Sequence, residues 1–237
     1  MLRLVVLVDN EPGAGLKSDW GWSVYLDDGS HRVLFDADTS PSVLEFNASR
    51  LGVDLKGLDF AVLSHHHFDH YGGFEAVGRA SPGLRVYVPP GPVERLARWG
   101  LEPIVVREAA ELVDGFWVSG PVHSGGWGLY EQALGVCLEG LGLVVVVGCS
   151  HPGADVLAEE VLEHSGCGGV FWVLGGYHSP GKSVLDRLAS MSRYLSPAHC
   201  SGSWAKSYVA KTYPEKYVPL RTGSIIVVEA GGRLVIK

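Results

Sequence analysis

A histidine-rich segment, His65-His66-His67-Phe68-Asp69-His70, constrains this chain more than any other feature of its sequence. It comes directly after the apolar run Ala61-Val62-Leu63, which predicts a buried strand, and directly before a turn at Gly72-Gly73. Side chains on an extended backbone alternate between two faces, so His65 and His67 point one way and His66 the other. This context is not that of an exposed histidine tag. The segment, called the histidine cluster below, predicts a metal site at a strand end.

The donor types of the histidine cluster narrow the choice of metal. Imidazole and carboxylate ligands without cysteine suit Zn, Fe or Mn, and ligand type alone does not choose among them. We expect His65 and His67 on a first divalent ion, and Asp69 and His70 on a second.

Composition limits the kind of partner. The 237 residues are 46% hydrophobic and 19% charged, which is typical of globular protein, and the formal charge is −7. That charge argues against nucleic acid and anionic membranes as partners, but not against a small anionic substrate. Residues 1–10 hold too short an apolar run for a signal peptide, and no run is long enough to cross a bilayer. We therefore expect a cytoplasmic protein.

Cysteines and amides are few. The four cysteines are scattered and form no CxxC pair, so no disulfide scaffold is expected and any single pairing stays open. Asn10, Asn47 and Gln132 are the only side-chain amides, a scarcity that suits a thermophile, although codon bias produces the same pattern. A thermophilic source would make an intracellular disulfide easier to accept.

Strand-rich blocks interleaved with helices predict an α/β (α+β) fold in one domain over residues 1–237, because no linker or repeat divides the chain. The expected strands are 2–8, 22–26, 32–36, 60–64, 84–89, 143–147, 170–174, 224–229 and 233–236, with further β pattern around 105, 117 and 136. The expected helices are 41–51 after an N-cap at Ser40, 92–99, 152–164 with Pro152 in its first turn, 183–195, and a short one near 204.

The motif Ser64-His65-x-His67-x-Asp69-His70-x-Gly72-Gly73 resembles the HxHxDH signature of the metallo-β-lactamase superfamily. Further segments resemble a subgroup that includes the archaeal 7,8-dihydropterin-6-methyl-4-(β-D-ribofuranosyl)aminobenzene-5′-phosphate synthases. These segments are 33–36, 47–52, 131–134, 143–153, 175–178 and 198–202. The resemblance implies an αββα sandwich, two packed mixed sheets flanked by helices, with the metals at one edge.

Two distant histidines are expected to complete the coordination. His151 follows the apolar strand 143–147, and we assign it to the first ion; His199 follows a helix, and we assign it to the second. His123 competes with His151, because superfamily members often carry a ligand just before a comparable hairpin. His178 also follows a strand, and is either a ligand or a catalytic group that donates a hydrogen bond to substrate.

One departure from the superfamily pattern concerns the late strand before His151. Hydrolases of the superfamily usually have a bridging aspartate there, whereas this strand ends Gly148-Cys149-Ser150. Without that bridge we expect the second ion to bind weakly or not at all. Cys149 is either a ligand for a soft metal or a small buried residue.

The stretch from Gly176 to Ser183 matches the phosphate-binding pattern GxxxxGK[ST], but too little chain follows for a nucleotide-binding domain. Its amides and Lys182 can still hold a phosphate. Tyr177, Trp204 and Lys206 are the other candidates for substrate contact, and Asp36 is expected to fix the histidine cluster through hydrogen bonds.

The leading hypothesis is a hydrolase in which metal-activated water attacks an ester, phosphoester or amide, with Asp69 orienting the water or accepting its proton. The first alternative is a transferase, in which pyrophosphate leaves a pterin methyl group and a carbon nucleophile attacks. The second is a non-catalytic metal-binding protein. The expected partner is a small molecule, phosphorylated or pterin-like.

Overall fold

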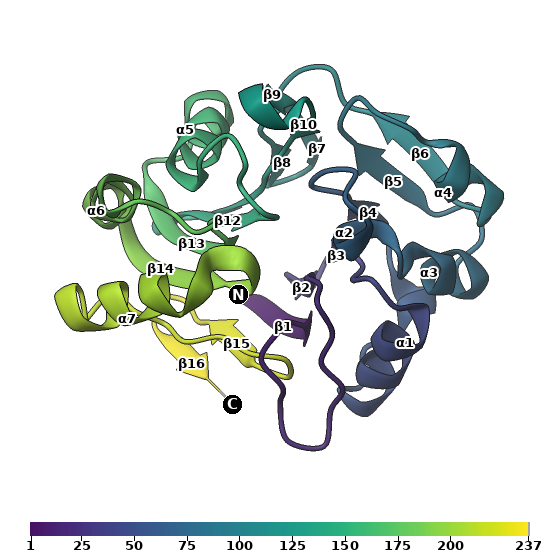
Figure 1. Ribbon diagram of the computed structural model, residues 1–237, viewed down its shortest axis with the longest axis horizontal. Helices are drawn as coiled ribbons and strands as arrows, with labels where there is room; N and C mark the ends of the chain where they lie inside the picture. The colour runs from purple at the N-terminus through teal and green to yellow at the C-terminus, as the bar shows by residue number, and fades with distance from the viewer. Residues whose placement is uncertain (237) are drawn as a thin grey trace. The chain divides into compact units, whose positions relative to one another are not determined.

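The computed structural model describes residues 1–236, which form two compact units. Unit 1 comprises residues 1–105 with the C-terminal segment from Arg221, and unit 2 comprises residues 106–220. Each unit contains a mixed sheet with helices against it, so the predicted class of mixed sheets flanked by helices is confirmed (Figure 1). That residues 1–237 form one domain stays a prediction. No helix within residues 1–236 has both the length and the apolar character needed to cross a bilayer.

The sheet of unit 1 is antiparallel on one side and parallel on the other, where β3 to β6 run in the same direction. In pairing order its described strands are β16 (Leu234–Ile236), β15 (Ile225–Val228), β1 (Leu2–Val8), β2 (Ser23–Asp27), β3 (Arg32–Phe35), β4 (Phe60–Val62), β5 (Arg85–Val88) and β6 (Glu102–Val105). Its helical segments are α1 (Pro41–Arg50), η1 (Leu55–Gly57), α2 (Phe68–Tyr71), α3 (Phe74–Ala80) and α4 (Glu94–Arg98).

Helices α1 and α3 pack on each other beside this sheet. Leu44 of α1 and Phe74 of α3 are fully buried in one core with Ala61 and Leu63, from β4 and the residue just after it. The short strand β4 is buried along its whole length, as expected for a parallel strand covered by helices. This packing fixes the backbone that leads into the histidine cluster.

The sheet of unit 2 has three parallel strands, β12, β13 and β14, followed by antiparallel ones. In pairing order its described strands are β14 (Ser192–Ala198), β13 (Val170–Gly176), β12 (Gly142–Val147), β11 (Leu134–Leu138), β8 (Phe116–Val118) and β7 (Ala110–Val113), with a separate pair β9 (Val122–His123) and β10 (Tyr130–Glu131). The helical segments are η2 (Gly125–Trp127), α5 (Ala154–Ser165), α6 (Lys182–Met191), η3 (His199–Ser201) and α7 (Gly202–Thr212).

Helices α5, α6 and α7 pack against this sheet and bury an apolar core with it (Figure 1). Strands β12 and β13 are buried throughout, which explains their continuous apolar runs. Because β12, β13 and β14 are parallel, the segments after their carboxyl ends begin at one edge of the sheet. His151, His178 and His199 all lie in those segments.

The structure corrects the expected helix 183–195. Helix α6 ends at Met191, and Leu195 lies in β14, where it pairs with Val173. The apolar spacing of the helix happens to continue as far as Leu195. Pairing with β13 nevertheless makes that residue part of a strand.

The predicted helix 152–164 also starts differently. Pro152 lies before α5, because Gly153, with a φ of 119°, precedes the first helical residue Ala154. By contrast, the predicted strand 2–8 is confirmed as β1, and Ser40 lies at the N-cap position of α1.

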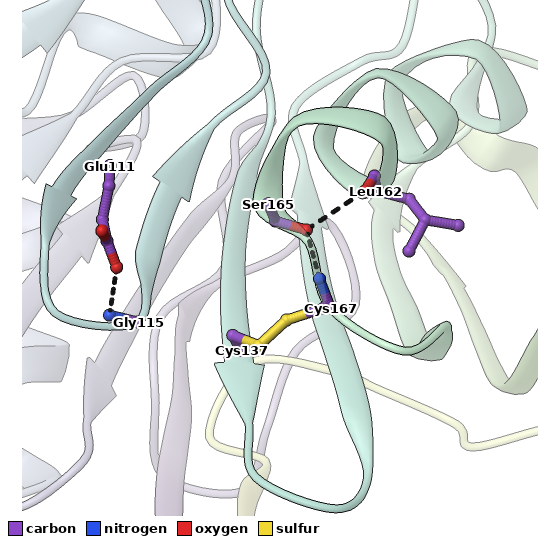
Figure 2. Close-up of a disulfide and its surroundings, with 6 residues drawn as sticks. All are labelled: Glu111, Gly115, Cys137, Leu162, Ser165 and Cys167. Atoms are coloured by element: carbon purple, nitrogen blue, oxygen red, sulfur yellow. Dashed lines mark hydrogen bonds between the residues drawn. A yellow bond between two sulfur atoms is a disulfide. The ribbon is translucent and has the colours of Figure 1, made fainter.

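A disulfide joins Cys137 in β11 to Cys167, which follows α5 (Figure 2). Their Cα atoms are 6.2 Å apart, within the usual range for a disulfide. The backbone amide of Cys167 also donates to Ser165 Oγ, whose hydroxyl donates to the carbonyl of Leu162. The bond closes a loop of 30 residues around α5, a pairing that the sequence had left open.

Candidate metal centre

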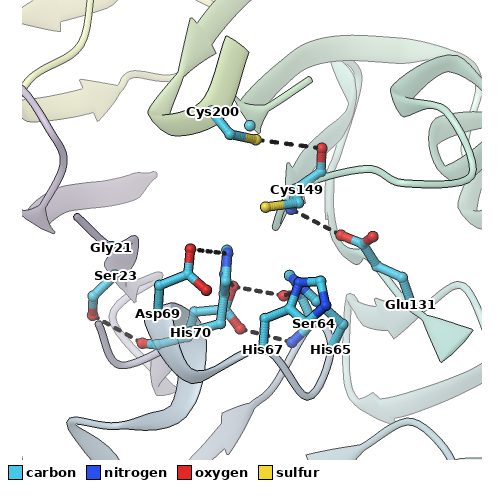
Figure 3. Close-up of polar contacts among 12 residues, drawn as sticks. Gly21, Ser23, Ser64, His65, His67, Asp69, His70, Glu131, Cys149 and Cys200 are labelled. Atoms are coloured by element: carbon cyan, nitrogen blue, oxygen red, sulfur yellow. Dashed lines mark hydrogen bonds and ion pairs between the residues drawn. The ribbon is translucent and has the colours of Figure 1, made fainter. Parts of the chain in front are cut away.

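The histidine cluster begins just beyond β4 and ends in the single helical turn α2. His65 Nε2 and His67 Nδ1 lie 3.1 Å apart. His66 turns away, and its Nε2 donates to the carbonyl of Pro89 at 2.9 Å. The predicted alternation of the three side chains is therefore confirmed. Asp69 follows on α2, with its Oδ2 3.7 Å from His70 Nε2 (Figure 3).

Asp36, just after β3, organises these rings. Its Oδ1 accepts from the amide of Ser64 at 2.7 Å, and its Oδ2 accepts from the Ser64 hydroxyl at 2.7 Å and from His70 Nδ1 at 2.6 Å. A hydroxyl has one proton to donate, and that of Ser64 goes to Asp36. His65 Nδ1, 2.9 Å from Ser64 Oγ, is then the donor in that contact. Both His65 and His70 therefore carry the proton on Nδ1 and keep Nε2 as the ligand nitrogen.

Asp36 occupies a strained and fully buried position. Its φ is 53°, in the left-handed region that an aspartate adopts at a cost. Burial raises the pKa of its carboxyl, while the His70 ring and the Ser64 donors act in the opposite direction. Such strain and burial need a compensating gain, and fixing His65 and His70 is one.

The distances between the donor atoms can be compared with those between two ligand atoms of one bound zinc ion. Two nitrogens bound to one tetrahedral zinc at about 2.0–2.1 Å lie roughly 3.3 Å apart. The separation of 3.1 Å between His65 Nε2 and His67 Nδ1 is close to that value. The 3.7 Å between Asp69 Oδ2 and His70 Nε2 is slightly longer. These nitrogen and carboxylate donors fit a divalent transition-metal ion.

In unit 2, the fully buried carboxylate of Glu131 plays the part that Asp36 plays in unit 1. It accepts from the amides of Cys149, Ser150 and His151 at 2.8, 2.7 and 2.8 Å, and from His151 Nδ1 at 2.8 Å. Burial alone would raise the pKa of Glu131, but the His151 ring and these amides outweigh it and hold the pKa below its ordinary value. His151 thus also keeps Nε2 as its ligand nitrogen.

The other predicted residues at this sheet edge differ in their surroundings. The His178 ring lies against His151, with centroids 4.4 Å apart, and against Trp127 at 4.9 Å. His199 is buried at the start of η3 with a φ of 45°. Cys149 is buried, and its carbonyl accepts from the Cys200 thiol at 3.7 Å (Figure 3). The neighbouring Cys149 thiol holds the pKa of Cys200 well below its ordinary value.

His123, the competitor of His151, lies exposed on β9. Its ring packs on Tyr130 with centroids 5.1 Å apart, and its Nδ1 accepts from the amide of Gly125 at 3.3 Å. Within residues 1–236, no carboxylate hydrogen bonds to the His123 ring, whereas Glu131 hydrogen bonds to the His151 ring.

The structure brings two of the four expected substrate contacts together. Lys182 is exposed, bonds Asp186 at 2.7 Å and lies 5.7 Å from the ring centroid of Tyr208. The exposed Trp204 stacks on the same Tyr208 ring at 5.3 Å. Lys206 lies half-buried on α7.

Tyr177, the fourth expected contact, is buried. Its hydroxyl donates to the carbonyl of Val173 at 2.7 Å, and burial raises its pKa.

Sequence reasoning did not single out Ser64, Glu131 and Cys200. Ser64 and Glu131 lie within segments of the family resemblance, and a carboxylate two positions before the largely apolar residues 133–138 is a usable signal. Cys200 also lies in such a segment, 198–202, and its position next to His199 was the one further signal.

Comparison with known proteins supports the class indicated by the fold and the histidine cluster. Residues 31–129, which include that cluster, match the family model described as a beta-lactamase superfamily domain. A solved metal-dependent hydrolase of the beta-lactamase superfamily, Tm1679, superposes with a TM-score of 0.83 at 24% identity, over 97% of this chain and 100% of that one. A diphosphatase from the PhnP family superposes with a TM-score of 0.63 at 18% identity, over 97% and 98%.

A curated relative is the 7,8-dihydropterin-6-methyl-4-(β-D-ribofuranosyl)-aminobenzene-5′-phosphate synthase of Methanocaldococcus jannaschii. It is 24% identical over 250 aligned positions, which cover 82% of this chain and 84% of the synthase. The resemblance to the metallo-β-lactamase superfamily, and to this subgroup within it, is confirmed, and the fold is of the metallo-β-lactamase type.

Proposed function

We propose that this chain is a metal-dependent hydrolase of an ester, phosphoester or amide. The observation that carries the proposal is the fixed protonation of His65 and His70, whose Nδ1 protons are held by Ser64 and Asp36. Buried networks of this kind are costly to build and serve to present unprotonated nitrogens to a metal. The fold agrees with this class, since Tm1679 is described as a metal-dependent hydrolase.

The proposed ligands are His65, His67 and His151 for a first ion, and Asp69, His70 and His199 for a second. The matching arrangement of His151 on Glu131 supports the inclusion of His151. The proposed ion is zinc, with iron and manganese as the alternatives, since nitrogen and carboxylate donors suit all three. When bound, such an ion would polarise the electrophile and lower the pKa of an attacking water.

The chain's own residues would orient the reactants. Asp69 has a carboxylate oxygen near His70 Nε2 and, in this proposal, orients the attacking water and accepts its proton. His178 is proposed to donate a hydrogen bond to the substrate, and its contact with the His151 ring at 4.4 Å supports that role. Asp36, Ser64 and Glu131 hold the rings in place.

The substrate is proposed to be a small molecule that carries a phosphate. Lys182 supplies a cation at the start of α6, and the stacked rings of Trp204 and Tyr208 supply a flat apolar surface nearby. In this proposal Lys182 pairs with the phosphate, and a ring system attached to the phosphate packs on Trp204 and Tyr208.

A second candidate is a transferase that joins a pterin to an arylamine. It is favoured by the synthase of M. jannaschii, which aligns over 82% of this chain. In that reaction pyrophosphate would leave the pterin methyl group, and a carbon of the arylamine would form the new bond.

One assay separates the two candidates. The purified chain is incubated with phosphodiesters and lactones, and separately with a pterin pyrophosphate in the presence and absence of an arylamine. Hydrolysis that needs no acceptor supports the hydrolase. Turnover of the pterin pyrophosphate only when the arylamine is present would reject the hydrolase and select the transferase.

A further inference from the structure

The carboxyl ends of the three parallel strands of unit 2 share a pattern. The last residues of β12, β13 and β14 are Val147, Gly176 and Ala198. Two residues beyond each end comes a side chain that binds soft metals: Cys149, His178 and Cys200. Parallel pairing of the three strands brings these positions to one edge of one sheet.

The three side chains meet there. One ligand atom from each, the two sulfurs and a ring nitrogen of His178, all lie within 4.8 Å of one another. Cys149 is 4% exposed, and Cys200 and His178 are half-buried. The Cys200 thiol donates to the carbonyl of Cys149, so both cysteines lie outside the disulfide and side by side.

The backbone is strained at each of these strand ends. Ser150, His178 and His199 have φ values of 65°, 45° and 45°, in a region that non-glycine residues seldom adopt. Each is either one of the three metal-binding residues or next to one. Strain that recurs at a single cluster of side chains is a mark of a functional site.

Gly176 allows Cys200 and the end of β12 to lie close to the end of β13. A Cβ atom on Gly176 would lie 2.7 Å from the Cys200 sulfur and 2.4 Å from the carbonyl oxygen of Gly148. Any larger residue at the end of β13 would therefore push Cys200 and the end of β12 away from it.

We propose that Cys149, His178 and Cys200 form a metal site of unit 2 that takes a soft divalent ion such as zinc or cadmium. Two thiolates and one imidazole are an established donor set for zinc, with a fourth position left for water or another ligand. One ring nitrogen of His178 would hold the ion, and its other N–H would remain able to hydrogen bond to a substrate. The site needs no donor from the histidine cluster.

Cobalt titration tests the proposal, because sulfur ligands give cobalt a charge-transfer absorption that nitrogen and oxygen ligands do not. We expect this absorption in the wild-type chain and in the His65→Ala, Asp69→Ala double variant. We expect it to weaken in Cys200→Ser, where the Cys149 thiolate is the one sulfur left in the site, and we expect cobalt affinity to fall about tenfold or more in His178→Gln. His164→Gln, on the exposed end of α5, is the matched control and should behave as wild type.

Two results would overturn the thiolate site: an absorption that is undiminished in Cys200→Ser, or one that disappears in the histidine-cluster double variant. The second result would not contradict the proposed hydrolase, so the experiment distinguishes a failure of the thiolate site from a failure of the proposed function.

A measurement on the unmodified chain guards against misfolded variants. Cadmium should slow maleimide labelling of Cys200 by about tenfold or more, as read by mass spectrometry, and an unchanged labelling rate would refute the site.

Discussion

Replacement of Glu131 by glutamine tests how the carboxylate fixes His151. The carboxylate accepts four hydrogen bonds, two on each oxygen, and is fully buried. Glutamine keeps one accepting oxygen and puts an NH₂ group in place of the other. Whichever way the amide turns, its NH₂ group then faces two buried N–H donors, and those two donors lose their acceptor.

The size of the effect follows from those two donors. Each buried donor left without an acceptor costs about 1–3 kcal/mol, so the free energy of unfolding should fall by roughly 2–6 kcal/mol. The His151 ring can relieve part of this by moving its proton from Nδ1 to Nε2. That shift removes Nε2 as a ligand, so metal affinity should fall roughly 10- to 100-fold.

Urea denaturation at neutral pH measures the first quantity, and competition with a chelator measures the second. Glu163→Gln, at an exposed position of α5, is the matched control and should change the unfolding free energy by less than about 0.5 kcal/mol. If Glu131→Gln matched that control in both stability and metal affinity, the account of His151 would be refuted.

Three further changes have defined outcomes. Ser64→Ala removes the acceptor of the His65 Nδ1 proton and should weaken metal binding roughly 10- to 100-fold in a chelator competition, whereas the exposed control Ser203→Ala should not. The double change Cys137→Ser, Cys167→Ser opens a loop of 30 residues and should lower the unfolding free energy by about 3–4 kcal/mol in urea without reductant; a loss below about 1 kcal/mol would contradict this. Lys182, Tyr208 and Tyr213 lower the pKa of Asp186 from 3.8 to about 2, so its contribution to stability is present above pH 3.8 and lost as the pH falls through 2. Asp186→Asn should therefore destabilise the chain at neutral pH, with a deficit that shrinks between pH 4 and 2 in thermal melts; a deficit independent of pH would argue against the carboxylate.

Strands that are buried throughout were predictable from sequence, because burial on both faces leaves a continuous apolar run. Strand β12 shows this, as does β1 apart from the half-buried Arg3, and the expected bounds differ from the observed ones by at most one residue. The end of α6 was not predictable, because Leu195 continues a helical spacing and only its pairing with Val173 makes it part of a strand.

The histidine cluster was predictable for a different reason: its donors are local and follow one strand. Hydrogen-bond partners from distant segments were harder to find. Ser64 and Asp36 are 28 positions apart, and Glu131 and His151 are 20 apart. Periodicity says nothing about pairs at such separations. The adjacency of Cys149 and Cys200, 51 positions apart, arises only when β12, β13 and β14 align.

Elemental analysis of the purified chain is the most direct test of a metal centre at the histidine cluster. The wild-type chain should carry at least one bound transition-metal ion that dialysis against buffer does not remove. The His65→Ala, Asp69→Ala double variant should hold at least one metal ion fewer per chain than the wild type, and zinc added back should not restore that ion. A wild-type chain that is purified without metal, and whose zinc uptake is unchanged in the double variant, would contradict the central claim.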